Sequence, residues 1–565
     1  MIAIINADVY SVKLDKTLIR AEAVVTQDDK IIFVGSNEEA KAYIKEETRV
    51  IDAGGRTVLP GLCDAHVHAS WSGSALFSCN LFGLAHNGEK GSVIEKIQKK
   101  LKEYVDNNPG KAIIKGCGWD MFDFMKAFPD KSMLDKICAD KPVVLESYDQ
   151  HHVWLNSKAL AMAGITKETP QPRDGQIYKD KNGEPTGLLS EFSAIDLVRK
   201  GIPDYDYSVE EYKDILRRYQ QEFAGPYGVT MIFDALSSDN AKKAYVELAK
   251  AGELTMRVRD NYYADPTKPE SQFDDMIASK GSSDVGEDYV QNCVKFFMES
   301  GVPDTYFCEP YKPLALKVMR RPKGYRGFAF WEAEELRRIL PKLMKAGFQI
   351  HTHAMGDGSV KHTVDAYEYA FQTTGLDTRN VIAHVMLVKP EDFVRMGKNK
   401  ILACVQPTWM AMMKADRKTL NMALGKKRVE QMYPYKRFLD QDIIVSAGTD
   451  FPVTPPPCPF IEMEHGLTRK VCAAAEGYEN SSRLILGPKG DPEQDIVQMQ
   501  DIIQSRTING AYQGFAEDIT GSIEVGKSAE LVLLDRNLPD TPLHEIHNTK
   551  VLVTIFKGQV VYKAE

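Results

Sequence analysis

Two histidine pairs, each with one residue between its members, make this chain a candidate for metal binding. His66 and His68 end one apolar run, and His351 and His353 lie within another. In an extended strand, residues i and i+2 point to the same face, so the two imidazoles of a pair can approach one ion. Imidazole nitrogen binds zinc and several other divalent metals. The sequence therefore predicts metal-competent side chains on two strands.

Three further residues place charged or metal-competent groups in or after apolar runs. His384 ends the run NVIAH, Asp450 follows IIVSAGT, and Lys295 lies inside NCVKFF. A single histidine is often only a hydrogen-bonded or surface residue, and an aspartate after a strand often caps the next helix. Because metal-competent residues end four separate runs, we favour one shared metal site over unrelated structural roles.

Lys295 needs compensation, because an unpaired ammonium inside an apolar strand costs several kcal/mol. Two explanations are open. A nearby carboxylate could form an ion pair with the ammonium. Alternatively, the neutral amine could react with carbon dioxide to form a carbamate, an anion able to bridge two metal ions.

Eight β-rich segments, which alternate with helical patterns, supply the elements that position these residues. They begin near residues 62, 229, 255, 292, 348, 380, 401 and 443. The alternation predicts an α/β fold with a parallel sheet, and eight strands predict a closed (β/α)8 TIM-type barrel. Reacting groups in such barrels collect at the carboxyl ends of the strands, which is where most of the candidate residues lie.

The two ends of the chain resemble each other and differ from the middle. Their short β-rich segments predict that residues 1–58 and 515–565 pair into one small composite β-sandwich. We expect residues 59–514 to form the barrel. Residues 72–225 are too many for one crossover, so they are expected to form an inserted α+β subdomain over the barrel mouth. An exposed edge of the sandwich is compatible with a homodimer.

The composition of the chain limits which partners and which cellular compartment we expect. The chain has 71 Lys+Arg against 79 Asp+Glu, a net charge of −8, without a basic stripe, which argues against nucleic acid as a partner. Nine cysteines without a CxxC pair indicate reduced thiols. The amino terminus lacks the features of a signal peptide, and no apolar run reaches the roughly 18 residues that span a bilayer. We expect a cytoplasmic protein without a membrane partner.

Five segments taken together resemble a known family. GLCDAHVHAS, VKFFMES, HTHAMGD, NVIAHVML and SAGTDFPV, in this order, are similar to the amidohydrolase superfamily. The resemblance is to its branch of metal-dependent hydrolases with a large insertion after the first strand, which includes N-substituted formamide deformylase. The segments CGWD, YDQHHVWLNSKALAMAGI and GEPTGLLSE of the insertion also match this branch.

The resemblance implies a centre of two divalent ions, for which zinc is the expected metal. The implied ligands are His66, His68 and Asp450 for the more buried ion, His353 and His384 for the more exposed ion, and Lys295 as a bridging N6-carboxylysine. His351 does not match the family position and is expected to be a barrel-core histidine. Iron, manganese or cobalt would suit the same ligands.

The insertion is expected to contribute to the site. The resemblance implies that His151 is a catalytic residue that reaches the substrate from the insertion. Trp119 and Trp154 are expected to bind the substrate, as part of an apolar lining that includes Phe122, Phe124 and Trp71. Glu191 is expected to bind the substrate as well, or, if Lys295 is unmodified, to bridge the metals or support a ligand.

The chain departs from the branch pattern at three places. Ala383 precedes His384 where the branch commonly has glutamate, and Glu299-Ser300 follow the lysine strand where it has Asp-Gly. Gln150 replaces the glycine of an Asp-Gly-His motif in the insertion. Because no ligand is lost, we expect these changes to affect the choice of substrate and to leave the metal chemistry intact.

The function implied is hydrolysis of an amide-type C–N bond, other than a peptide bond, in a small N-acyl or N-formyl amine. Asp450 would act as the catalytic proton acceptor for a metal-activated hydroxide. A cyclic-amide hydrolase or a deaminase of the same superfamily is the alternative, and a deaminase would normally use one metal. A non-catalytic scaffold protein is a third hypothesis. Its signature would be missing ligands, and each expected ligand is present.

Overall fold

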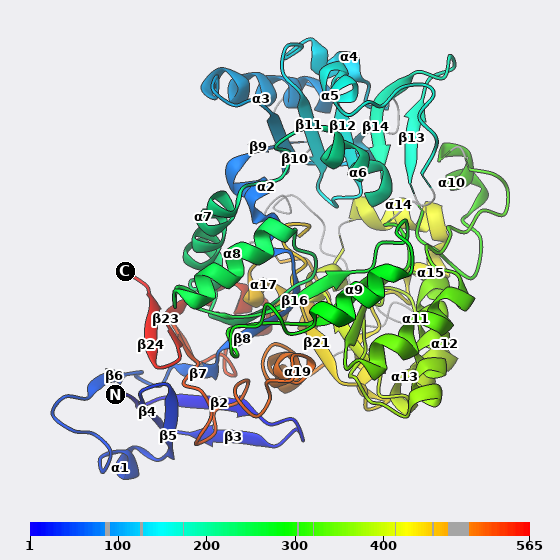
Figure 1. Cartoon of the computed structure of the whole chain (residues 1–565). Coiled ribbons are helices and arrows are strands. Elements are labelled where there is room, and N and C mark those ends of the chain that lie inside the picture. Colours follow the sequence, from blue (N-terminus) through cyan, green and yellow to red (C-terminus); the bar gives the residue numbers. More distant parts are fainter. Residues whose placement is uncertain are drawn as a thin grey trace.

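Eight parallel strands form the central sheet of this computed structural model, in the order β21-β20-β19-β18-β17-β16-β15-β8 (Figure 1). They are β8 (Leu62–Val67), β15 (Val229–Asp234), β16 (Arg257–Tyr263), β17 (Tyr289–Phe297), β18 (Gln349–Ala354), β19 (Val381–His384), β20 (Leu402–Val405) and β21 (Val445–Ala447). Each lies within or beside a segment predicted to be a strand, so the predicted TIM-type barrel is confirmed. The structure describes residues 1–84, 91–124, 128–172, 175–301, 304–319, 321–412, 414–454, 457–472 and 497–565.

The first and last strands approach each other at their carboxyl ends. The backbone N–H of Asp450 donates to the carbonyl of His66 over 2.8 Å, and the N–H of His68 donates to the carbonyl of Phe451 over 2.8 Å. A Cβ at Gly448 would lie 2.4 Å from the backbone nitrogen of His66. Glycine is therefore required where the end of β21 meets β8.

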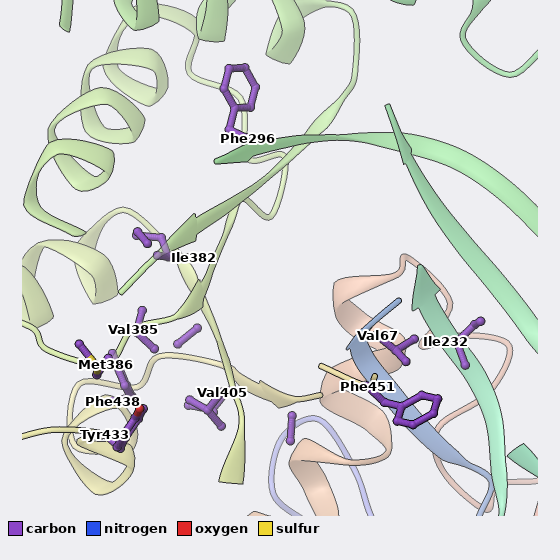
Figure 2. Close-up of a cluster of buried hydrophobic side chains, with 14 of the residues drawn as sticks. Val67, Ile232, Phe296, Ile382, Val385, Met386, Val405, Tyr433, Phe438 and Phe451 are labelled. Carbon is purple, nitrogen blue, oxygen red and sulfur yellow. The ribbon is translucent and has the colours of Figure 1, made fainter. Parts of the chain in front are cut away.

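Alternation along the strands separates the outer core from the cavity. On β17, Phe296 stacks with Phe273 of α9 (Ser271–Ser279) at a ring distance of 6.1 Å, while its neighbours Lys295 and Phe297 line the cavity. Val67, Ile232, Ile382 and Val405 belong to the same apolar cluster as Phe296 and are shown in Figure 2. Because successive side chains alternate, a strand buried on both faces can hold apolar residues on one face and reacting groups on the other.

Helices cover the outside of the barrel. They include α8 (Asp239–Lys250), α11 (Ala333–Lys345), α12 (Asp357–Thr374) and α13 (Pro390–Lys398). The hydroxyl of Ser238 accepts a hydrogen bond from the N–H of Ala241 and so caps the first turn of α8. This cap fixes where α8 begins after β15, whereas α13 begins with Pro390 at its first turn and has no side-chain cap.

Both ends of the chain build one six-stranded sheet, in the order β24-β23-β22-β7-β2-β3. Its strands are β2 (Asp8–Val12), β3 (Leu18–Ala21), β7 (Thr57–Pro60), β22 (Leu531–Leu534), β23 (Val551–Phe556) and β24 (Gln559–Lys563). A second sheet, β5-β4-β1-β6, comprises β1 (Ile2–Ile5), β4 (Ala23–Gln27), β5 (Lys30–Gly35) and β6 (Arg49–Asp52). Val24, Val58 and Leu533 pack in one cluster between them. These sheets support a composite terminal domain, whose boundaries stay a prediction.

A third sheet lies within the predicted insertion. Its order is β13-β14-β12-β11-β10-β9, and its strands are β9 (Cys79–Asn80), β10 (Ile114–Trp119), β11 (Val143–Ser147), β12 (His152–Leu155), β13 (Gln176–Lys179) and β14 (Pro185–Ser190). The helices α3 (Val93–Asn107), α4 (Lys131–Asp135), α5 (Ser157–Met162) and α6 (Phe192–Gly201) accompany it. Figure 1 shows this part, in cyan, on the opposite side of the barrel from the blue and red terminal sheets.

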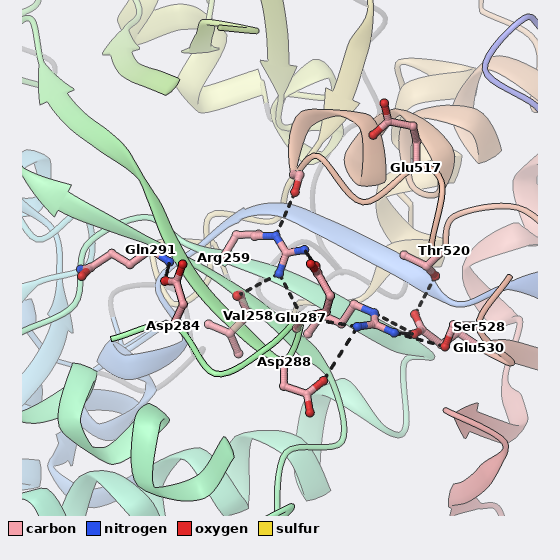
Figure 3. A network of polar contacts seen from close by, with 12 residues as sticks. Val258, Arg259, Asp284, Glu287, Asp288, Gln291, Glu517, Thr520, Ser528 and Glu530 are labelled. Atoms are coloured by element: carbon pink, nitrogen blue, oxygen red, sulfur yellow. Dashed lines mark hydrogen bonds and ion pairs between the residues drawn. The ribbon is translucent and has the colours of Figure 1, made fainter. Parts of the chain in front are cut away.

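Buried charged residues attach the carboxyl-terminal segment to the barrel. The guanidinium of Arg257 on β16 donates to Glu530 over 2.9 Å, and that of Arg259 donates to the carbonyl of Gly514 over 2.9 Å (Figure 3). Glu530 also accepts a hydrogen bond from Thr520 over 2.6 Å. The end of the barrel away from the cavity is thus fixed to the last part of the chain. Within the described residues, no helix combines the length and apolar character that crossing a membrane requires.

Candidate metal centre

All six predicted metal ligands line one cavity of about 330 Å³ at the carboxyl ends of the barrel strands. They are His66, His68, Lys295, His353, His384 and Asp450. Each is buried, with at most 5% of its surface exposed. Residues separated by up to 384 positions in the sequence therefore converge on one space, as the barrel fold requires.

His66, His68 and Asp450 form the tightest group of potential ligands. Asp450 Oδ1 lies 3.3 Å from His66 Nε2 and 3.3 Å from His68 Nε2. Two ligands that are each about 2.0–2.1 Å from a tetrahedral zinc ion lie about 3.3 Å apart. Asp450 Oδ1 is buried and makes no hydrogen bond among the described residues. The donor set and its spacing fit a divalent metal.

His353 and His384 form the second pair. Their ring centroids lie 4.5 Å apart, and His353 Nε2 is a buried nitrogen without a hydrogen bond to any described residue. Burial lowers the pKa of His384 to about 4 and holds the pKa of His353 and of His66 well below the usual value. All three imidazoles are therefore neutral at pH 7, which is the form that binds a metal.

Lys295 lies between these groups. Its Nζ is 3.4 Å from His66 Nε2, and no carboxylate of the described chain forms an ion pair with it. Burial lowers the pKa of Lys295 to about 8, although the charge of Asp450 acts in the opposite direction. An ion pair therefore does not explain this lysine, and a substantial fraction of neutral amine is available near pH 8.

Contacts behind the ligands fix their orientation. His66 Nδ1 lies 2.8 Å from Nε2 of His351, which is a barrel-core histidine as expected. His384 Nδ1 lies 2.8 Å from the amide oxygen of Gln406. Each contact engages Nδ1 of the ligand histidine, so that its Nε2 is left on the cavity side for a metal. Gln406 was missed by the sequence analysis, although it directly follows the strand predicted near residue 401.

Two tryptophans stack on ligand imidazoles. Trp71 stacks on His68 at a ring distance of 4.0 Å, and Trp409 stacks on His384 at 5.3 Å. Both also line the cavity. Trp71 was among the expected apolar lining residues, whereas Trp409, which follows Gln406 by three positions, was missed. A tryptophan just after a barrel strand is the signal that could have identified it.

His151 reaches the cavity from the insertion, between β11 and β12. Its Nδ1 lies 2.9 Å from Oε2 of Glu191, and its ring centroid lies 6.0 Å from that of His353. Burial disfavours the charged imidazole, but the carboxylates of Glu191, Asp149 and Asp450 outweigh burial and raise the pKa of His151 to about 9. His151 is therefore a cation at pH 7, able to donate a hydrogen bond toward the cavity.

Trp119 and Trp154 lie away from the cavity, which corrects the expectation that they bind the substrate. Their rings pack together at 6.2 Å in the core of the insertion, and Trp119 Nε1 donates to the carbonyl of Leu145. Phe124 packs in the same core, and the side chain of Phe122 lies outside the described residues. The strands β10 and β12 are central in their sheet, so large side chains on them fill its core.

Glu191 is buried behind His151. Its carboxylate contacts His151 and Ser300, and it is not among the residues that line the cavity. A role as a bridge between metals therefore has no geometric support, and a role in supporting His151 does.

The chain is similar in sequence and in fold to known proteins. A model of the amidohydrolase family matches residues 49–562 of the chain. LONG AFTER FAR-RED 3 of Arabidopsis thaliana is 27% identical over 97% of this chain and 89% of its own length. N-substituted formamide deformylase of Arthrobacter pascens is 25% identical over 99% of this chain and 98% of its own. The crystal structure of a metal-dependent hydrolase from Pyrococcus horikoshii shares the fold, with a TM-score of 0.72 at 24% identity, covering 96% of this chain and 99% of that one.

Proposed function

This chain belongs to the amidohydrolase family, and on that premise we propose that it is a metal-dependent hydrolase of an amide-type C–N bond in a small molecule. The observation that carries the proposal is the convergence of His66, His68 and Asp450 on spacings of 3.3 Å within the barrel mouth. His353 and His384 lie in the same cavity. Buried polar atoms without a partner cost free energy, and a scaffold protein without activity would gain nothing from such a set.

We propose that the cavity holds two divalent ions, with zinc as the expected metal. His66, His68 and Asp450 would hold one ion, and His353 and His384 the other. Lys295 would join them as N6-carboxylysine, which forms when the neutral Nζ bonds to the carbon of carbon dioxide and one proton leaves. The lowered pKa of Lys295 and its lack of a described ion-pair partner support this step. When bound, such ions lower the pKa of water and polarise a carbonyl group.

The residues of the chain itself supply proton transfer and orientation. Burial raises the pKa of Asp450, but its contacts with His66 and His68 outweigh burial and hold this pKa well below its usual value, so the carboxylate is ionised and able to accept a proton. Asp450 would take a proton from the attacking water and deliver it to the leaving nitrogen. The N–H of His151 would donate to the substrate carbonyl oxygen as negative charge develops there.

The lining of the cavity supports a substrate with a bulky apolar group. An apolar wall of the cavity is formed by Trp409 together with Met355, Met386, Met412 and Leu420. Methionine side chains are unbranched and adapt to irregular shapes, and tryptophan offers a large flat surface. We therefore propose an N-acyl or N-formyl amine that carries an aromatic or branched group. The relative named N-substituted formamide deformylase supports the N-formyl form of this proposal.

A cyclic-amide hydrolase or a deaminase of the superfamily is the second candidate, and the deaminase reaction would normally use a single metal ion. Of the described residues around the cavity, only His66, His68 and Asp450 have ligand atoms that all lie within 4.8 Å of one another. One tightly held ion would suffice for such a reaction. The metal content per chain separates a deaminase from the two-metal hydrolase.

The test combines metal analysis with a substrate screen. The purified chain, loaded with zinc in the presence of bicarbonate, should contain about two ions and hydrolyse N-formyl or N-acyl derivatives of aromatic amines. With 13C-labelled bicarbonate, a carbamate carbon signal should appear and should be absent from the Lys295→Ala variant. One ion per chain, no carbamate signal and release of ammonia from an amino group on a heterocyclic ring would favour a deaminase instead.

A further inference from the structure

Glu191 adopts a backbone conformation that is nearly exclusive to glycine. Its φ is 67° and its ψ is 158°, at the junction between β14 and α6. A side chain in this region is strained, and such strain persists only where the surrounding structure imposes it. Glu191 precedes the first turn of α6 without capping it through its side chain. The strain therefore has to be explained by other contacts of this residue.

The other contacts of Glu191 go to His151 and Ser300. Oε2 lies 2.9 Å from His151 Nδ1, and the backbone N–H of Glu191 donates to the carbonyl of His151 over 2.8 Å. Oε1 accepts a hydrogen bond from the hydroxyl of Ser300. Both carboxylate oxygens and the backbone N–H are thus committed, and two of these three contacts hold the same histidine.

Ser300 belongs to the barrel, whereas His151 and Glu191 belong to the insertion. Ser300 follows β17, the strand that carries Lys295, and only 2% of its surface is exposed. A Cβ at its neighbour Gly301 would lie 3.2 Å from Cδ2 of His151, so the barrel backbone abuts the imidazole directly. The contact between Ser300 and Glu191 therefore joins the two parts of the chain beside the cavity.

The imidazole of His151 has one nitrogen left for a substrate. Because Nδ1 donates to Glu191, Nε2 is the ring nitrogen left for the cavity, which His151 lines. Nε2 donates there in the protonated imidazole, the form that the Glu191 carboxylate stabilises. The ring is also confined by Phe192, at a centroid distance of 5.7 Å. The backbone N–H of His151 donates to the carboxylate of Asp149 over 3.1 Å. Position and orientation are both restricted.

We infer that Ser300 and Glu191 are positioning residues, which hold His151 of the insertion against the barrel so that its Nε2–H donates to the substrate carbonyl. This inference rests on the proposed amide hydrolysis. His151 and Ser300 contact the two different oxygens of the Glu191 carboxylate. The strained backbone of Glu191 is the conformation that brings the carboxylate between the two residues.

The kinetic test compares three substitutions with one matched control. Ser300→Ala should lower kcat about tenfold, as expected for loss of a hydrogen bond to a charged group, with KM within about twofold. Glu191→Gln should lower kcat further, and Ser300→Thr, which keeps the hydroxyl, should restore part of the rate lost in Ser300→Ala. The control is Ser237→Ala, which also removes a buried hydroxyl bonded to a carboxylate, that of Asp260, but outside the cavity lining. Its kcat should be unchanged.

Glu191→Gly separates a functional role from a structural one. Glycine removes the backbone strain, so the midpoint of thermal unfolding should stay the same or rise while kcat falls at unchanged metal content. If Glu191 were needed only for folding, the midpoint would fall together with kcat. That result, or an unchanged kcat in Ser300→Ala, would overturn the inference.

A spectroscopic readout keeps the inference testable without any substrate. In 15N-histidine-labelled protein, the ring signals of His151 are identified by their absence from His151→Gln. They should shift in Ser300→Ala and Glu191→Gln, and stay in place in Ser237→Ala. Unchanged His151 signals in Glu191→Gln would overturn the positioning role. Shifted signals in a protein that hydrolyses no amide would support the positioning contacts and refute the proposed function.

Discussion

At the scale of single residues, the candidate site contains two kinds of buried polar side-chain atom: those without a hydrogen-bond partner among the described residues and those with one. Asp450 Oδ1 and His353 Nε2 are buried without hydrogen bonds among the described residues, while Nδ1 of His384 is held by Gln406. The first kind of atom is available to a metal, and the second orients the ring that carries it. This division follows from the side-chain contacts and not from residue type.

Asp450 is predicted to be required for the chemistry more than for the metal. Asp450→Asn keeps an oxygen that can bind an ion but removes the proton acceptor, so kcat should fall by about 10³-fold. Metal content, measured on the same sample by mass spectrometry, should fall much less than the rate. Undiminished turnover in this variant would contradict the assigned role of Asp450.

Gln406 is predicted to set the affinity for the metal through His384. Gln406→Met keeps the size of the side chain and removes the oxygen that accepts from His384 Nδ1, so zinc affinity should fall by about 10- to 100-fold. Gln349→Met is the matched control, because Gln349 is also buried but, among the described residues, its side chain bonds only to backbone carbonyls away from the cavity. Equal zinc affinities of the two variants would refute the role of Gln406.

The sequence predicted the candidate ligands but not the residues that orient them. His66, His384 and Asp450 stand out because polar residues at the ends of apolar strands are unusual. The contact between His351 and His66 depends on the curvature of the barrel across strands that are 285 positions apart. Trp119 packs in the core of the insertion because it lies on a covered face of its sheet. The alternation of residues along a strand does not reveal which face is covered.

At the scale of elements, barrel closure depends on the junction of β21 with β8. Gly448→Ala would place a methyl group 2.4 Å from the backbone nitrogen of His66. Both strand ends would have to shift, so we expect a loss of about 1–3 kcal/mol in the free energy of unfolding, with weaker zinc binding. Denaturant unfolding and zinc titration check this.

Gly110→Ala is the control for that substitution. A Cβ at Gly110 would meet nothing within 4 Å. Its free energy of unfolding and zinc affinity should match those of the unsubstituted chain. A Gly448→Ala protein that also matched it would show that the junction tolerates a side chain and that its glycine is not required.

The eight barrel strands were predictable because each is a short apolar segment of suitable length. The order of the six strands in the insertion was not. Its edge strand β9 is only two residues long, and β12 pairs directly with β14 although α5 and β13 lie between them in the sequence. Such pairings are decided by packing between distant segments, which local patterns do not record.

At the scale of the whole molecule, the last part of the chain supports the barrel from the end opposite the cavity. Arg257 and Glu530 are an ion pair at 2.9 Å, with 3% and 0% of their side chains exposed. Glu530→Gln removes the closer and more buried of the two carboxylates that contact the Arg257 guanidinium, since Asp288 lies 3.8 Å away, so the free energy of unfolding should fall by about 3 kcal/mol. Chemical denaturation measures this.

The control for Glu530 is an exposed pair. Glu253→Gln removes the partner of Arg217 on the surface, where solvent screens the charges, and should change the stability little. If both variants had the same stability, the attachment of the carboxyl-terminal segment to the barrel would not depend on the buried pair.

Glu524 gives the terminal sheets a defined dependence on pH. Burial disfavours its charge, but contacts with Ser522, Lys13 and Lys527 outweigh burial and lower the pKa of Glu524 to about 2. A lowered folded-state pKa contributes stability above the unfolded value of about 4.5, and that contribution is lost as the pH falls toward 2. The stability difference between the native chain and Glu524→Gln should therefore shrink over this interval. A constant difference would contradict the lowered pKa of Glu524.

The central claim is that hydrolysis depends on metal held by the histidines and Asp450 of the barrel mouth. Removal of metal with a chelator, followed by titration with zinc, tests it most directly, with amide hydrolysis measured at each point. We predict that activity is lost on chelation, returns as about two ions bind per chain, and does not return in His66→Ala. Activity that persists without metal, or returns equally in His66→Ala, would contradict the account.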